Sequence, residues 1–295
     1  MKKSSSRKAL LYILISLTLV FILFPVFWII IMSIRPEAEQ FILPPRPFVP
    51  TLQNYVTIFL AGTIAWQSGF GSAVGKASGI VIGQTAGVAM GNTLIIASMS
   101  TLSSILLGLP AAYSFSRFKM RGSRDLQFYI LSQRMAPPIA IIVPLFTLLR
   151  FAGLNNTYLG LTIAHLSFNL PFAIWLIKGF VDEIPKEMDE SAQLDGCSTS
   201  GIIWRIIFPL LKPGIAAVAI LCFLFSWNEF LFVSILSGPQ TTTLTVFLAS
   251  FITNVAIEWG KLATVVVISF LPAVILVLIL QRYLVRGLTF GAVRG

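Results

Sequence analysis

Six apolar runs alternate with polar segments along the chain. They cover residues 9–34, 91–113, 126–150, 159–181, 214–236 and 262–284. A helix of about 20 residues spans the roughly 30 Å hydrocarbon core of a bilayer, so each run can cross a membrane. The pattern therefore predicts an all-α polytopic membrane protein with six transmembrane helices.

The first apolar run follows a basic segment, which is also typical of secretory signal peptides. Residues 2–8 hold four basic residues, and the 26 residues from 9 to 34 hold no charge. A signal peptide has an apolar core of only about 7–15 residues that ends at small residues, whereas this run ends in the bulky sequence FPVFWIII. Residues 1–34 are therefore interpreted as an amino-terminal segment and a retained first span.

Residues 35–87 form the longest segment outside the apolar runs, and they separate the first span from a transmembrane core at residues 88–295. The first part, RPEAEQFILPPRPFVP, is too rich in proline to form a continuous helix. The second part, residues 60–88, is rich in glycine and is compatible with a mobile external loop, an interfacial helix or a re-entrant segment. We favour an external loop with short helical pieces.

The third apolar run contains three prolines within its length. They are Pro137, Pro138 and Pro144. A proline removes a backbone hydrogen bond from a helix, which membrane helices tolerate where neighbouring groups satisfy the freed carbonyl. We therefore expect a kink or a break in this span.

Composition supports a membrane protein and excludes several other classes. The chain is 56% hydrophobic and 11% charged, whereas soluble domains are roughly a quarter charged. Its net charge of +10 does not indicate nucleic-acid binding, because the basic residues cluster beside the ends of apolar runs. Two cysteines and one histidine give neither a disulfide framework nor a metal-ligand cluster.

The distribution of lysine and arginine predicts how the chain is oriented. Fifteen of its 21 basic residues fall on one side of the predicted spans. This side includes both termini, residues 117–124 and the polar segment between the fourth and fifth spans. Cytoplasmic loops carry the excess of basic residues, so both termini and this segment are predicted to be cytoplasmic.

The segment between the fourth and fifth spans, residues 182–213, is here termed the acidic loop. It holds six of the eleven acidic residues of the chain. Pro185 and the acids after it favour a helix over residues 185–195, and Gly196 can adopt the left-handed conformation that ends a helix. Ser198, Thr199 or Ser200 can cap a second short helix, which we expect Pro209 to limit.

The acidic loop resembles the EAA loop of the integral-membrane permeases of ABC importers. That pattern is EAA, three residues, Gly, nine residues and then Ile-x-Leu-Pro, and the spacing here matches it throughout. The matching residues are Glu190, Ser191, Ala192, Gly196, Ile206, Phe208 and Pro209. Ser191 replaces the first Ala of the motif and Phe208 replaces its Leu. The sequence NTL at residues 92–94 and the tail RGLTFGAVRG are similar to the maltose-type carbohydrate permeases of this family.

The resemblance implies a type I ABC importer permease fold and a set of partners. These are a second homologous permease, two cytoplasmic ATPase subunits, an extracytoplasmic solute-binding protein and the lipid bilayer of the bacterial cytoplasmic (inner) membrane. The residues expected to couple the chain to the ATPase are Glu190, Ser191, Ala192, Asp195, Gly196, Ile206 and Pro209. The chain has no GxxxxGK[ST] phosphate-binding loop, so ATP and Mg²⁺ belong to the partner, and we expect the chain to be neither an enzyme nor a cofactor-binding protein.

The carboxyl-terminal tail, residues 286–295, is expected to reach the ATPase subunits as well. Family resemblance points to Leu288, Thr289, Gly291 and Arg294 as contacts. The alternative is that this basic, glycine-containing tail only anchors the last helix at the cytoplasmic surface of the membrane.

Several polar residues inside the apolar runs are candidates for a solute pathway. They are Arg134, His165, Asn169, Trp227, Asn228 and Glu229. Polar groups are costly in a membrane and often mark a pathway, and asparagine or glutamate beside an aromatic ring suits a sugar. The alternative is that these side chains hold the helices together, for example through an ion pair between Arg134 and Glu229.

The leading hypothesis is a permease subunit of a binding-protein-dependent importer of a di- or oligosaccharide or a polyol. A secondary transporter driven by an ion gradient is a second hypothesis, but internal repeats and several intramembrane acids would be expected of it. A non-transporting membrane scaffold is a third, and it has no need of a loop with EAA spacing.

Overall fold

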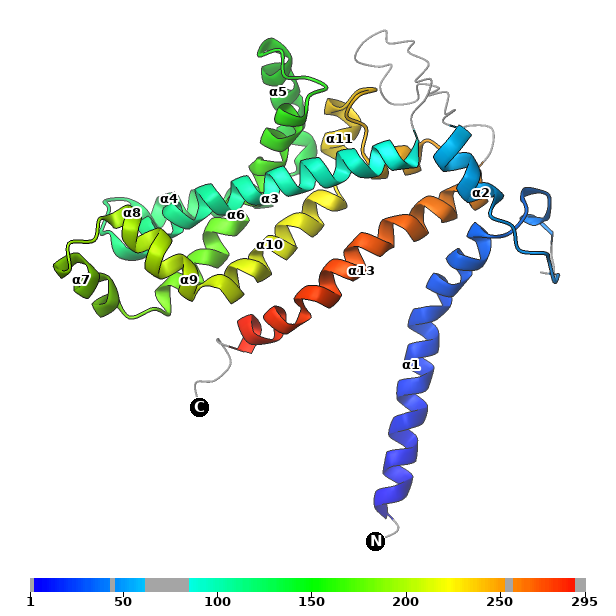
Figure 1. Ribbon diagram of the computed structural model, residues 1–295, viewed down its shortest axis with the longest axis horizontal. Helices are drawn as coiled ribbons and strands as arrows, with labels where there is room; N and C mark the ends of the chain where they lie inside the picture. The colour runs from blue at the N-terminus through cyan, green and yellow to red at the C-terminus, as the bar shows by residue number, and fades with distance from the viewer. Residues whose placement is uncertain (1–2, 43–45, 62–84, 253–256, 290–295) are drawn as a thin grey trace. The chain divides into compact units, whose positions relative to one another are not determined.

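A computed structural model describes residues 3–42, 46–61, 85–252 and 257–289. Within these ranges the secondary structure is helical, and the one β-type contact is an isolated bridge between Ile252 and Ile257 (Figure 1). The chain divides into two compact units. The amino-terminal unit consists mainly of residues 1–67 and 248–271, and the core unit consists mainly of residues 87–247 and 272–295. The predicted all-α class is confirmed.

The first predicted span is the long helix α1 (Lys3–Ser33), which belongs to the amino-terminal unit. Its apolar part from Lys8 to Ser33 is long enough to cross a membrane and is not buried by the rest of the chain. A helix that is apolar all round must find lipid or another apolar surface, so its sequence is matched to a membrane and not to water.

Three short helices follow α1 in the described residues. They are η1 (Glu37–Glu39), α2 (Gln53–Val56) and the π-helical turn η2 (Thr57–Ala61). The buried side chain of Asn54 donates from Nδ2 to the carbonyl oxygens of Ser33 and Arg35, at 3.0 and 3.2 Å. This asparagine satisfies carbonyl groups at the carboxyl end of α1 that have no partner within the helix.

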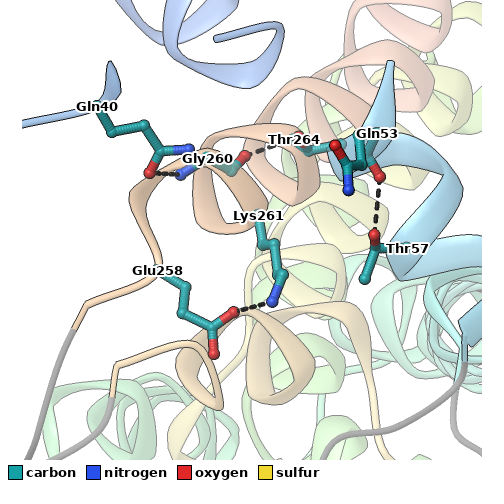
Figure 2. Close-up of polar contacts among 7 residues, drawn as sticks. All are labelled: Gln40, Gln53, Thr57, Glu258, Gly260, Lys261 and Thr264. Atoms are coloured by element: carbon teal, nitrogen blue, oxygen red, sulfur yellow. Dashed lines mark hydrogen bonds and ion pairs between the residues drawn. The ribbon is translucent and has the colours of Figure 1, made fainter. Parts of the chain in front are cut away.

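The last long helix, α13 (Trp259–Thr289), begins in the same unit. The Gly260 amide donates to Oε1 of Gln40 at 3.0 Å, and the side chain of Lys261 pairs with Glu258 (Figure 2). The Thr264 hydroxyl contacts the carbonyl oxygens of Gly260 and Ser33, at 2.7 and 3.3 Å. These polar contacts join the start of α13 to the end of α1.

The core unit is built on three long helices: α3 (Ala86–Arg117), α6 (Tyr158–Asp182) and α10 (Lys212–Trp227). Helices α3 and α6 run parallel, because three contacts between them follow one another in the same order along both helices. Near the middle a Cβ on Gly108 would lie 3.3 Å from Cβ of Ala173, so the glycine lets the two backbones approach closely. Helix α10 packs against α6 (Figure 1).

The third predicted span is a bent pair of helices, and another bent pair joins residues 199–210 of the acidic loop to α10. In the third, α4 (Ser123–Ser132) and the 3₁₀ turn η4 (Gln133–Met135) meet α5 (Pro138–Phe151) at 97°. The break falls at Pro137 and Pro138, as the prolines predicted. In the described part of the chain four helices can cross a membrane, or up to six if each of the two bent pairs counts as one span.

The fifth predicted span, residues 214–236, is not one continuous helix. Helix α10 ends at Trp227, and a separate short helix, α11 (Leu231–Leu236), packs against α5 and α6. The break has a local cause. The Asn228 side chain donates to the Leu224 carbonyl at 2.8 Å, and Oε1 of Glu229 accepts the Phe232 amide at 2.9 Å. One polar side chain therefore ends α10 and the next one begins α11.

The loop after α11 is fastened to the amino-terminal ends of α3 and α6. Nδ2 of Asn92 donates to the carbonyl oxygens of Gln240 and Thr242, and Oδ1 accepts the hydroxyl of Tyr158 at 2.7 Å. The neighbouring Thr93 hydroxyl accepts the Leu244 amide at 2.8 Å, where α12 (Leu244–Ala249) begins. The NTL sequence thus joins the start of α3 to the start of α6 and to the loop before α12 through side-chain hydrogen bonds. Residues 62–84, most of the glycine-rich stretch, lie outside the described residues.

Candidate functional site

The first half of the acidic loop forms the helix that the sequence predicts. Helix α7 (Lys186–Leu194) starts directly after Pro185, whose extended backbone (φ −57°, ψ 137°) leads the chain into the helix. Glu187 and Asp189 lie in its first turn, where negative charge is favourable beside the helix dipole. The predicted and observed helices differ by one residue at each end.

Gly196 ends this helix in the left-handed conformation, with φ of +82°. The Cys197 amide donates to the Ala192 carbonyl at 2.9 Å, and the Gly196 amide donates to the Gln193 carbonyl at 3.0 Å. This pair of hydrogen bonds is the Schellman motif. The predicted role of Gly196 as the turn is confirmed, because residues other than glycine are strained at this φ.

The second helix of the loop begins at Ser198, whose hydroxyl accepts the Gly201 amide at 3.2 Å. It runs from Thr199 to Leu210 and includes a π-helical turn at Ile202–Ile207. The prediction that Pro209 limits this helix is wrong by one residue. The helix continues through the proline and ends at Leu210, where the chain bends by 84° into α10. We attribute this to the wider π turn, which gives the proline ring room beside the preceding carbonyl groups.

The two sides of α7 have opposite surroundings. Asp189 and Ala192 are buried, with exposed fractions of 4% and 6%. Ile206, in the second helix, is half-buried. The exposed residues of the motif are Glu190, Ser191, Asp195, Gly196 and Pro209. The EAA spacing therefore places one small residue in the interior and turns the glutamate and the serine outward.

The buried side of the acidic loop belongs to a single apolar core that it shares with α3, α6 and α10. From the loop this core takes Ala192, Ile202, Ile203, Ile207 and Leu211. The long helices contribute Tyr113, Val181 and Val218 among others. Since interiors of this kind are close-packed, the loop cannot shift without displacing the ends of these helices.

One functional candidate was missed by sequence reasoning. Nε of Arg117, at the end of α3, lies 2.5 Å from Oδ2 of Asp189, and Nη2 donates to the Ile184 carbonyl at 2.8 Å. Both side chains are buried. Four basic residues at 117–124 and six acids in the loop allow many pairings, and only the fold selects this one.

Asn169 lies where three helices of the core unit meet. Its Nδ2 is 3.1 Å from the Ser100 hydroxyl of α3, and on α10 it is 2.9 Å from the Ser226 hydroxyl and 3.1 Å from the Cys222 carbonyl. The residue has no exposed surface. In this conformation Asn169 holds helices together, which is the second of the two roles considered for it.

His165 and Trp227 are also buried. The His165 ring lies 5.4 Å from the Phe168 ring, and neither of its nitrogens has a hydrogen-bond partner among the described residues. The Trp227 ring stacks on Phe223 at 5.6 Å with an interplanar angle of 18°. Helical spacing places His165 and Asn169 on one face of α6, as predicted.

Arg134 and Glu229 do not pair with each other in the described structure. Nη1 of Arg134 donates to the Phe168 carbonyl at 2.9 Å, and its guanidinium lies 4.3 Å from the Phe225 ring and 4.9 Å from the Phe172 ring. Each such cation–π contact is worth about 0.5–2 kcal/mol. The suggested ion pair is therefore wrong. Arg134 contacts aromatic rings, and the Glu229 carboxylate accepts the Phe232 amide of α11, because the break after Trp227 turns Glu229 toward α11.

Residues 104–290 of the chain match the family described as the binding-protein-dependent transport system inner membrane component. The match covers more than half of the chain and contains the whole acidic loop. The chain belongs to this family. The protein is therefore a permease, a membrane-embedded subunit of an ABC importer, and not an enzyme; ATP hydrolysis belongs to a separate partner subunit.

Two relatives span nearly the whole permease. The trehalose/maltose transport system permease protein MalG of Thermococcus litoralis is 30% identical over 297 residues, covering 100% of both chains. The trehalose transport system permease protein SugB of Mycobacterium tuberculosis is 32% identical over 286 residues, covering 96% of both chains. Similarity over full length includes the segments on either side of the matched family region.

The fold of the permease is similar to a chain of a bacterial ABC transporter involved in the import of the acidic polysaccharide alginate. The TM-score is 0.73 at 21% identity, with 96% of the permease and 98% of that chain covered. The predicted type I ABC importer permease fold is confirmed.

In the predicted tail, Leu288 and Thr289 form the end of α13, and Gly291 and Arg294 lie outside the described residues.

Proposed function

We propose that this permease moves a sugar across the bacterial cytoplasmic membrane, driven by ATPase subunits that grip its acidic loop. The observation that carries the proposal is the geometry of α7: Glu190 and Ser191 face outward while Ala192 lies in the core shared with the long helices. An ATPase subunit can bind the exposed side of α7, while the buried side packs against the long helices that must move.

The proposed assembly contains two permeases, two cytoplasmic ATPase subunits and an external solute-binding protein. Each ATPase subunit receives the exposed side of α7, with Asp195 and Gly196 at the rim and Pro209 near the next bend. The tail residues Leu288, Thr289, Gly291 and Arg294 make further contacts with the ATPase subunits. ATP and Mg²⁺ bind to those subunits, so the permease itself carries no cofactor.

The transport mechanism follows from the shared core. When the ATPase subunits close on ATP, they move α7, and the close-packed cluster under it moves the ends of α3, α6 and α10. The spans thereby alternate between an outward-open and an inward-open arrangement. The chemical energy is spent outside the membrane, and the permease converts it into a change in which side the solute site faces.

Charge reversal at Glu190 tests the docking role. In the Glu190→Lys variant we expect the amount of ATPase that co-purifies with the permease to fall at least about tenfold, because like charges brought together at an interface cost several kcal/mol. Glu183→Lys is the matched control, since Glu183 is also exposed but precedes α7. Equal ATPase recovery with both variants would contradict the docking role.

The solute class is tested with the complete transporter in lipid nanodiscs. The names of the two relatives, which refer to trehalose/maltose and trehalose transport, favour a disaccharide. With the cognate binding protein present, we expect a di- or oligosaccharide to raise ATP hydrolysis about five- to tenfold, a size typical of coupling between two sites. If only a polyol stimulated ATP hydrolysis, the solute would be a polyol and not a sugar. If neither compound stimulated ATP hydrolysis, the proposed solute class would be rejected.

A further inference from the structure

The acidic loop is attached to α3 by a buried ion pair as well as by apolar packing. The side chains of Arg117 and Asp189 are only 6% and 5% exposed, and Nε and Oδ2 lie 2.5 Å apart. The same guanidinium donates through Nη2 to the Ile184 carbonyl, just before α7 begins. Arg117 therefore holds both the first turn of α7 and the segment that leads into it.

No other ion pair in the described ranges joins the loop to a different helix. Lys178 and Asp182 form an ion pair four residues apart in α6, and their side chains are 23% and 44% exposed. The pair of Lys261 and Glu258 lies outside the core unit. Exposed pairs contribute little to stability, whereas a buried pair cannot be broken cheaply because each charge has lost its water.

The opposite end of α3 is fastened too. Asn92 and Thr93 bind the loop before α12, and Tyr158 at the start of α6 donates to Asn92. Helix α3 is thus held by polar side chains at its first turns and at its last residue, and between them it packs along α6. A continuous helix held in this way can pass a displacement from one end to the other.

We propose that Arg117 and Asp189 are positioning residues that transmit the movement of α7 to α3, so that ATP hydrolysis is coupled to the exchange of the spans. Neither residue faces the docking surface: Asp189 points inward from α7, and Arg117 belongs to α3. The pair thus acts behind the surface that the ATPase grips. This inference rests on the proposed function, since it requires an ATPase bound to the exposed side of the loop.

The test uses the complete transporter in nanodiscs, with its ATPase subunits and binding protein. Asp189→Asn keeps the shape of the side chain and removes its charge. The double variant Arg117→Met/Asp189→Leu replaces both charges by apolar groups of similar size, a change that buried ion pairs often tolerate without loss of folding. Asp182→Asn is the control, because it removes a carboxylate from the exposed pair with Lys178.

The measurement is solute transported per ATP hydrolysed, together with ATPase co-purification. We expect both altered pairs to retain the ATPase subunits and ATP hydrolysis within about twofold, while solute moved per ATP falls about tenfold. The Asp182→Asn control should keep the ratio of the unmodified protein. A role in folding alone would reduce the amount of assembled transporter and leave the ratio of the assembled fraction unchanged.

Two results would overturn the inference. One is an unchanged ratio in either altered transporter, which would mean that apolar packing alone carries the movement. The other is loss of assembly in both, which would assign the pair to folding. Failure of the proposed function looks different, because the unmodified permease would then recover no ATPase.

Discussion

Replacing Gly160 by alanine should lower the melting temperature of the purified permease by about 5–10 °C. A Cβ at this position would lie 2.2 Å from the Leu154 carbonyl oxygen, far inside van der Waals contact. The backbone of Leu154 cannot yield freely, because its carbonyl accepts the Thr157 hydroxyl at 2.7 Å and that hydroxyl caps α6 through the Gly160 amide. The extra methyl group must therefore break the cap or strain the turn, at a cost of about 3 kcal/mol.

Gly179→Ala in the same helix is the matched control. No atom lies within 4 Å of a Cβ at Gly179, and alanine favours helix over glycine by about 1 kcal/mol. Its melting temperature should be equal to or above that of the unmodified permease, measured by loss of the monodisperse peak after heating. If the two variants had the same melting temperature, the close approach at Gly160 would not affect the stability of the permease.

Replacing Asn169 by alanine should also destabilise the permease, by about 2 kcal/mol. The change removes the contacts with Ser100, Ser226 and the Cys222 carbonyl and leaves a cavity where three helices meet. Thermal melting of the purified subunit measures the loss. Asn228→Ala is the comparison, because it removes one exposed contact at the end of α10 and should cost less, at most about 1 kcal/mol.

The same variant separates the two roles considered for Asn169. A side chain that holds helices together affects the amount of assembled transporter, whereas a solute ligand affects the apparent affinity for the solute. We expect the assembled fraction of Asn169→Ala to transport with unchanged apparent affinity, and Glu229→Ala to behave in the same way because its carboxylate begins α11. A loss of affinity of tenfold or more, about 1.4 kcal/mol, would identify the altered residue as a solute ligand.

Much of the fold could be predicted because the deciding signals are local. An apolar run is long enough to span a membrane whatever surrounds it, so α1, α3, α6 and α13 follow from composition. The prolines at 137 and 138 mark the bend between α4 and α5 for the same reason. In the acidic loop, Pro185, Gly196 and Ser198 each impose a backbone conformation within a few residues of themselves, and the two short helices were predicted from them.

The break after Trp227 was missed although a signal was present. Residues 214–236 form one apolar run, in which Asn228 and Glu229 are candidates for the solute pathway or for contacts between helices, but not for a helix boundary. Asparagine and glutamate side chains also satisfy the free ends of helices, and side by side they can end one helix and begin another. This role predicts a helix boundary after Trp227.

The sequence by itself determined the membrane class, the six apolar runs, the positive-inside orientation expected for them and the spacing of the EAA motif. Each of these depends on residues close together in the chain. The tertiary structure decided which side of α7 is buried, which of the four basic residues at 117–124 pairs with Asp189, and that Arg134 lies among aromatic rings instead of beside Glu229. Those choices join residues far apart in the chain, and burial makes them: a buried charge must find a partner, and only packing determines which group is within reach.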